Sequence, residues 1–108
     1  MRGTVLIVDD DEGLRQSLGE FLEAEGYRVL SASNGRHALG VLEDETPSLI
    51  LIDVAMPVMS GWKLCEALSH YPDLARIPRL LIEKPVNPGK LASAIAARVR
   101  PVPSTAAA

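Results

Sequence analysis

Three aspartates stand at the ends of two apolar segments, in a pattern that suits the binding of a hard metal ion. Asp9 and Asp10 follow directly on Thr4–Val8, and Asp53 closes the run Leu49–Asp53. If these runs are neighbouring parallel strands, about 4.8 Å apart, their carboxyl ends bring the three carboxylates into one pocket, where such sheets bind ligands. Carboxylates about 4 Å apart repel by roughly 4 kcal/mol at an effective dielectric constant near 20. A hard, oxygen-preferring cation offsets this repulsion, and Mg²⁺ fits better than a soft metal.

The same aspartates have simpler interpretations. Asp9, Asp10 and Asp11 could form a solvated turn that caps a helix beginning near Glu12, and capping is the role we expect for Asp11. For Asp10 with Asp53, the metal site is favoured, because two separate buried strands both end in acid at the site-forming edge. Asp9 and Asp11 also form the D-x-D pattern of Mg²⁺-dependent phosphohydrolases, a weak alternative because the other signatures of those enzymes are not visible.

The elements that must position these carboxylates alternate between strand and helix patterns, which predicts an α/β domain with a mainly parallel sheet. Strands are expected at Thr4–Val8, Tyr27–Ser33, Leu49–Asp53 and Arg79–Ile82. Helices are expected at Glu12–Glu25, at Asn34–Glu45, from Ser60 to before Pro72, and after a cap at Asn87. Right-handed crossovers then give the strand order 2-1-3-4, with the two most apolar strands in the centre. Residues 1–100 are expected to form the domain and residues 101–108 a flexible tail.

Composition bounds the class of protein. The chain has 108 residues, 47% of them hydrophobic and 23% charged, as in an ordinary globular domain. A net charge of −3 leaves no basic surplus for nucleic acid. The single cysteine permits no internal disulfide, and the N-terminal apolar stretch is too short for a signal peptide or a membrane span. We therefore expect a cytoplasmic protein with no nucleic-acid or membrane partner.

The segments LIVDDDEGLRQSL, LILIDVAMPVMSG and EKPV resemble the receiver domain of bacterial two-component response regulators. The resemblance runs from about Thr4 to Ile77 and resumes at Glu83. It implies a flavodoxin-like (CheY-like) doubly wound parallel sheet, here reduced to four strands. It also implies a phosphoprotein that takes its phosphoryl group from a sensor histidine kinase and acts on a downstream protein target, rather than a multiple-turnover enzyme.

The resemblance also assigns roles within the site. It implies that Asp53 is the phosphoacceptor and that Lys84, followed by a cis bond to Pro85, pairs with the phosphoryl oxygens. The implied ligands of Mg²⁺ are Asp9, Asp10, Asp53 and the main-chain carbonyl of Ala55. These roles suit phosphoryl transfer, which depends mainly on positioning and charge neutralisation. An aspartate nucleophile forms an acyl phosphate, whose oxygens a metal ion and an ammonium group can neutralise.

The loop after the expected strand Leu49–Asp53 contains residues that shape the turn and residues that pack against the core. Pro57 and Gly61 match the loop of the family, where they shape the turn behind the phosphorylation site, although Pro57 could equally serve only to break a strand. Met56, Met59 and Trp62 are expected to be packing residues.

The sequence departs from the family before the Lys-Pro pair. Lys84 follows Asp53 by only 31 residues, which is shorter than the family spacing by about one helix-strand unit. Near Glu83 the family has a Ser or Thr. The family also has an aromatic residue that moves with this Ser or Thr, and Leu80–Ile82 contain none. The phosphorylation half of a receiver is thus expected, without most of the surface that usually contacts targets.

The shortened chain has a further implication for the edge of the sheet. Arg79–Ile82 becomes an exposed sheet edge, so we expect a homodimer formed through this truncated edge. Two alternatives also stay open. Lys84 could be a surface lysine before a turn proline, and the chain could be a pseudo-receiver, an interaction scaffold that is not phosphorylated.

Overall fold

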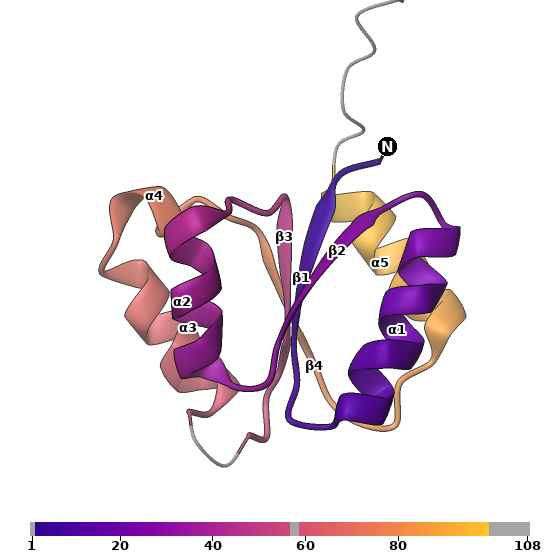
Figure 1. Cartoon of the computed structure of the whole chain (residues 1–108), viewed down its shortest axis with the longest axis horizontal. Helices are drawn as coiled ribbons and strands as arrows, with labels where there is room; N and C mark the ends of the chain where they lie inside the picture. The colour runs from indigo at the N-terminus through magenta and orange to yellow at the C-terminus, as the bar shows by residue number, and fades with distance from the viewer. Residues whose placement is uncertain (1, 57–58, 100–108) are drawn as a thin grey trace, which may run out of the picture.

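The computed structural model describes residues 2–56 and 59–99. Within these residues a four-stranded parallel sheet lies between two layers of helices (Figure 1). The strands are β1 (Thr4–Val8), β2 (Arg28–Ala32), β3 (Leu49–Asp53) and β4 (Arg79–Ile82), in the order β2-β1-β3-β4. The predicted doubly wound order 2-1-3-4 is therefore confirmed, with β1 and β3 in the centre.

The helices cover both faces of this sheet. Helices α1 and α5 lie on one face, and α2 and α3 lie on the other, with the short α4 beside α3 (Figure 1). Their bounds are α1 (Glu12–Ala24), α2 (Gly35–Asp44), α3 (Gly61–Ser69), α4 (Pro72–Ala75) and α5 (Pro88–Arg98). The sequence did not predict α4. Its first residue is a proline, which lacks the N–H that a first turn leaves unpaired and has a helical φ angle. The expected roles of Pro57 and of residues 101–108 lie outside the described residues.

Side-chain caps fix where the longer helices begin. In each case an oxygen on the residue before the helix accepts a hydrogen bond from a main-chain N–H of the first turn. The pairs are Asp11 with Leu14 (3.1 Å), Asn34 with His37 (2.8 Å), Ser60 with Lys63 (3.2 Å) and Asn87 with Lys90 (3.0 Å). The predicted capping role of Asp11 is confirmed.

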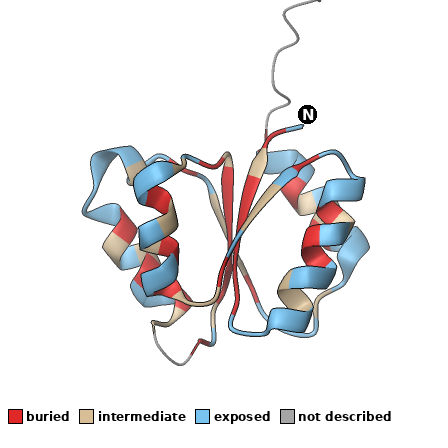
Figure 2. Cartoon of the chain, viewed as in Figure 1, coloured by how far each residue is buried: buried red, intermediate tan, exposed pale blue. Residues whose placement is uncertain are grey.

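The two central strands are buried on both sides, which explains their unbroken apolar sequences (Figure 2). Alternate side chains of β1 and β3 pack either against α1 and α5 or against α2 and α3.

Met56 and Met59 pack in the core between the sheet and helices α2 and α3, as expected. Trp62 does not, because 65% of its surface is exposed. Helix α3 buries Gly61, Leu64 and Leu68, and Trp62 lies one residue off that stripe.

Candidate functional site

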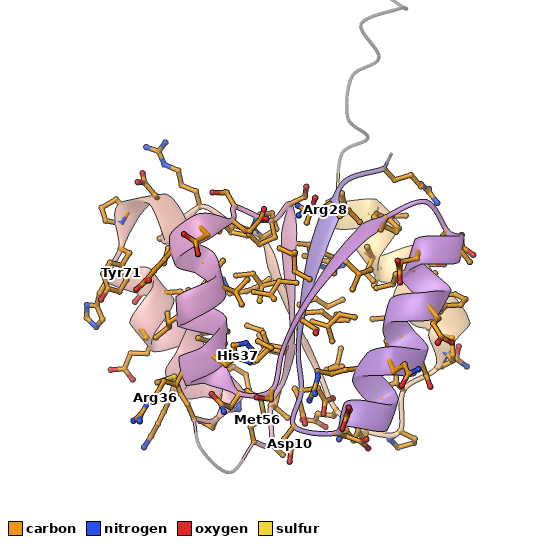
Figure 3. All side chains as sticks on the ribbon, in the orientation of Figure 1. Asp10, Arg28, Arg36, His37, Met56 and Tyr71 are labelled. Atoms are coloured by element: carbon orange, nitrogen blue, oxygen red, sulfur yellow. The ribbon has the colours of Figure 1, made fainter. Side chains whose placement is uncertain are left out.

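The carboxyl ends of β1 and β3 bring three acidic side chains together. Carboxylate oxygens of Asp9, Asp10 and Asp53 all lie within 4.8 Å of one another. Val8 pairs with Ile52 in the parallel ladder, so the residues that follow them emerge side by side. Asp9 and Asp53 are buried and Asp10 is exposed at the lower end of the sheet (Figure 3). The cluster therefore has a buried floor and one side open to solvent.

Lys84 contributes a cation to the same cluster. Its Nζ lies 3.2 Å from Asp9 Oδ1 and 3.6 Å from Asp53 Oδ2. The peptide bond from Lys84 to Pro85 is cis. Burial on its own lowers the pKa of Lys84, but the hydrogen bond to Asp9 and the charges of Asp9, Asp53 and Asp10 raise it above its ordinary value. The ammonium group is therefore charged at neutral pH and lies among the carboxylates, rather than pointing away from them.

Asp9 is the most deeply buried acid of the cluster. Its Oδ1 accepts hydrogen bonds from the Asp11 N–H (2.8 Å) and from Lys84 (3.2 Å). Its Oδ2 is buried and has no hydrogen-bond partner among the described residues. An unpaired buried carboxylate oxygen is costly, and an oxygen-preferring cation would satisfy it. The donor set and this free oxygen fit Mg²⁺, with Asp9, Asp10 and Asp53 as the carboxylates that would hold it.

Burial is the main reason why the pKa of Asp9 is raised. The charge of Asp53 adds to this shift, whereas the hydrogen bonds from Asp11 and Lys84 oppose it. The pKa of Asp9 in the folded protein lies above its ordinary value of 3.8. The stability that Asp9 contributes is therefore fully present below about pH 3.8, the pKa of the unfolded chain. It is lost as the pH rises through the folded pKa.

This shift leads to a prediction for the metal-free protein. As the pH rises from about 4 to about 7, the urea midpoint of the wild type should fall relative to that of Asp9→Asn, which cannot ionise. Parallel unfolding curves of the two proteins in a chelating buffer measure the difference. A difference that stays constant across this pH range would contradict the raised pKa of Asp9.

Asp53 lies at the end of β3 with its two oxygens in different surroundings. Oδ1 accepts a hydrogen bond from the Ala55 N–H (3.1 Å), and Oδ2 faces Lys84. A cavity next to this carboxylate is lined by Asp53, Val54, Ala55, Glu83 and Lys84. The carboxylate is thus oriented by the main chain and borders a space in which a reacting group could sit.

Gly61 allows the first turn of α3 to approach β3 closely. A Cβ atom at this position would lie 2.6 Å from the Asp53 carbonyl oxygen and 2.9 Å from Val54 Cα. Both are main-chain atoms next to the site, so a larger residue would displace the strand end or the helix. The sequence placed Gly61 in the turn, and the structure gives the physical reason.

Gly61→Ala should therefore destabilise the protein by about 1–3 kcal/mol, the usual cost of overpacking. Gly40→Ala is a matched control in the exposed middle of α2, where a Cβ would meet nothing within 4 Å. It should stabilise the protein by up to about 1 kcal/mol, because alanine is the better helix former. Urea unfolding of both variants tests this, and equal midpoints would contradict the proposed close contact.

Two further residues bear on the site. Arg15, on α1, donates a hydrogen bond to the Asp9 carbonyl oxygen and so fixes the turn that carries the acidic pair. Sequence reasoning missed Arg15, and its only signal was its place at the end of the first turn of the helix that follows the aspartates. Asp11 is outside the carboxylate cluster and caps α1, which leaves the D-x-D interpretation without its second carboxylate.

Comparison with known sequences identifies similar proteins. The family described as "Response regulator receiver domain" matches residues 5–82. Sporulation initiation phosphotransferase F of Bacillus subtilis is 35% identical over 77 residues, which cover 71% of this chain and 62% of that protein. The probable transcriptional regulator ycf27 of Pyropia yezoensis is 41% identical over 70 residues, which cover 65% of this chain and 29% of that protein. The chain thus spans less than two thirds of the length of these relatives.

Solved structures show the same architecture. Chemotaxis protein CheY4 of Vibrio cholerae superposes with a TM-score of 0.85 and 27% identity, covering 92% of this chain and 100% of that chain. The signal receiver domain of a signal transduction histidine kinase from Syntrophus aciditrophicus gives a TM-score of 0.79 and 31% identity, covering 95% and 98%. No helix in the described part of this chain is long and apolar enough to cross a membrane.

Proposed function

Because the chain belongs to the response regulator receiver domains, the signalling modules of two-component systems, we propose that it accepts a phosphoryl group on Asp53 with Mg²⁺ bound beside it. One observation carries this proposal. The Asp53 carboxylate shares a pocket with two further carboxylates, within 4.8 Å, and with the ammonium group of Lys84 at 3.6 Å. A nucleophile, ligands for a hard cation and a counter-charge for phosphoryl oxygens thus occupy one place.

Asp9, Asp10, Asp53 and the main-chain carbonyl of Ala55 would hold the metal ion. When bound, Mg²⁺ supplies positive charge that neutralises phosphoryl oxygens. The Ala55 N–H orients the Asp53 carboxylate, whose oxygen attacks the phosphorus of the donor. A new P–O bond forms on Asp53 as the bond between phosphorus and donor breaks, and the donor keeps that electron pair.

We propose that the Lys84 ammonium group pairs with the phosphoryl oxygens once Asp53 is phosphorylated. In this structure its ammonium group lies between two carboxylates. Once Asp53 carries a phosphoryl group, the added oxygens present more negative charge than the carboxylate did, and the ammonium is close enough to pair with them. A sensor histidine kinase is the proposed donor, and a downstream protein that recognises the phosphorylated form is the proposed target.

Phosphorylation by acetyl phosphate tests this function without knowledge of the kinase. The protein should become phosphorylated when Mg²⁺ is present and not when a chelator is added, as seen on a gel that retards phosphoproteins. Beryllofluoride should bind under the same conditions. If neither phosphorylation nor beryllofluoride binding occurs, the alternative of an unphosphorylated interaction scaffold is favoured.

Glu83 is expected to restrain phosphorylation, because it lines the cavity over Asp53 and carries the same charge as the incoming group. Glu83→Gln should raise the initial rate with acetyl phosphate about fivefold, which corresponds to removing roughly 1 kcal/mol of repulsion. Glu43→Gln is the matched control, since it removes the same charge near the far end of α2. Equal rates for the two variants would show that Glu83 has no such effect.

A further inference from the structure

β4 forms one edge of the sheet, and half of its main-chain groups face no strand among the described residues. It pairs with β3 alone. The Pro78 carbonyl accepts a hydrogen bond from Ile50 of β3, and the Ile82 carbonyl accepts one from Val54, the residue after β3. Because a strand alternates with a period of two, the N–H and C=O groups of Arg79 and Leu81 point away from β3. They form an open ladder on which another strand can pair.

Apolar side chains flank this ladder. Leu81 is half-buried and belongs to neither core cluster. On the opposite face of β4, a groove separates the strand from α5. Its apolar lining is Leu80, Ile82, Pro85, Val86, Leu91 and Ala94. The edge therefore offers a hydrogen-bonding ladder together with apolar surface on both of its faces.

The charges at the two ends of β4 are of opposite sign. Arg79 begins the strand and Glu83 follows its last residue. Neither forms an ion pair with another side chain in the described part of the chain. The guanidinium of Arg79 instead donates to main-chain carbonyls near α3 and α4, at 3.1–3.4 Å. A strand with a cation at one end and an anion at the other complements an antiparallel copy of itself.

We propose that β4 pairs with β4 of a second copy of this chain, antiparallel and about a two-fold axis through Leu81. In this register the two Leu81 residues form a hydrogen-bonded pair, and Arg79 of each copy lies opposite Glu83 of the other. On the other face, Leu80 lies opposite Ile82, and the two grooves beside α5 join. The same patch serves on both copies, as a two-fold interface requires.

A second copy fits this edge better than an unrelated strand, because it supplies both opposite charges at the required spacing. The register also brings a positive charge to Glu83, which lines the cavity over Asp53. The pairing does not depend on phosphorylation, so it is tested without a phosphoryl donor. Failure of the dimer and failure of the proposed phosphorylation are therefore separate results.

Sedimentation velocity of the full chain over a range of concentrations measures the association. The wild type should form dimers. Leu81→Pro should be monomeric with an unchanged far-UV spectrum, because it removes an N–H that points outward and makes no hydrogen bond to another described residue. Leu81→Val retains that N–H and should still form dimers. A monomeric wild type, or a Leu81→Pro variant that still forms dimers, would overturn the proposal.

Charge exchange tests the register itself. Glu83→Lys places two cations opposite each other at both ends of the pair, and Arg79→Glu places two anions there. Each variant alone should dimerise about tenfold more weakly than the wild type. A mixture of the two restores both opposite-charge pairs, so it should form a heterodimer. If the mixture associates no better than its components while their far-UV spectra match the wild type, the proposed register is wrong.

Discussion

Asp53→Asn should abolish phosphorylation by acetyl phosphate, down to the background of the assay. The amide retains an oxygen that can accept the Ala55 N–H at the position of Oδ1, so the end of β3 should keep its conformation. It lacks the carboxylate that attacks phosphorus and would carry the acyl phosphate. The loss is expected to be complete rather than partial. Among the described residues, Asp53 and Glu83 are the acids that line the cavity beside Lys84, and of these two Asp53 has the carboxylate that a main-chain N–H orients.

Asp11→Asn is the control for this experiment. Asp11 is also one of the aspartates near the site in sequence, but it caps α1 and is outside the carboxylate cluster. Asparagine caps helices about as well as aspartate, so this variant should be phosphorylated like the wild type. Phosphorylation that persists in Asp53→Asn would remove Asp53 from the reaction, and its loss in Asp11→Asn would point to a fault in the turn instead.

Removing the proposed buried metal ligand, Asp9, should have the second large effect. In Mg²⁺ at about one hundred times its dissociation constant, the wild type should gain about 2.7 kcal/mol of stability, or roughly 10 °C or more in Tm. Asp9→Asn removes a charged side chain that we propose as a ligand, and its Oδ2 has no hydrogen-bond partner among the described residues. Loss of an outer-shell partner alone costs about 10- to 100-fold in metal affinity. At a hundredfold loss, the gain from the same Mg²⁺ falls to about 0.4 kcal/mol.

Thermal unfolding with and without Mg²⁺ measures this gain directly. Asp11→Asn should respond to the metal like the wild type, because its side chain serves the helix cap. Comparing the gain within each variant cancels the effect of each substitution on the metal-free protein. An Asp9→Asn protein that gains as much stability from Mg²⁺ as the wild type would show that Asp9 does not hold the ion.

The sequence could predict the sheet because its two central strands are buried on both faces and therefore read as unbroken apolar runs. The acids that follow β1 and close β3 mark the site, because adjacent parallel strands end at the same edge of the sheet. The starts of the four longer helices were also predictable, because side-chain capping acts over three residues, whereas α4 begins without such a cap and was not predicted. Features determined by local chemistry and by strand period can thus be inferred without coordinates.

Features that depend on long-range packing could not be inferred. The contact of Arg15 with the Asp9 carbonyl depends on how α1 lies against the sheet. The exposure of Trp62 depends on which stripe of α3 faces the core. Lys84 could have been a surface lysine until the coordinates placed its Nζ 3.2 Å from Asp9. Each of these outcomes requires the relative position of two elements, which no short segment of sequence contains.

The central claim, that Asp53 receives the phosphoryl group, is tested most directly by locating the modified residue. Borohydride reduces an aspartyl phosphate to homoserine, which tandem mass spectrometry of proteolytic peptides can assign to one position. After reaction with acetyl phosphate and Mg²⁺, we expect homoserine at position 53 and unmodified aspartate at positions 9 and 10. Homoserine at another aspartate, or no reduction product from a protein shown to be phosphorylated, would contradict this account.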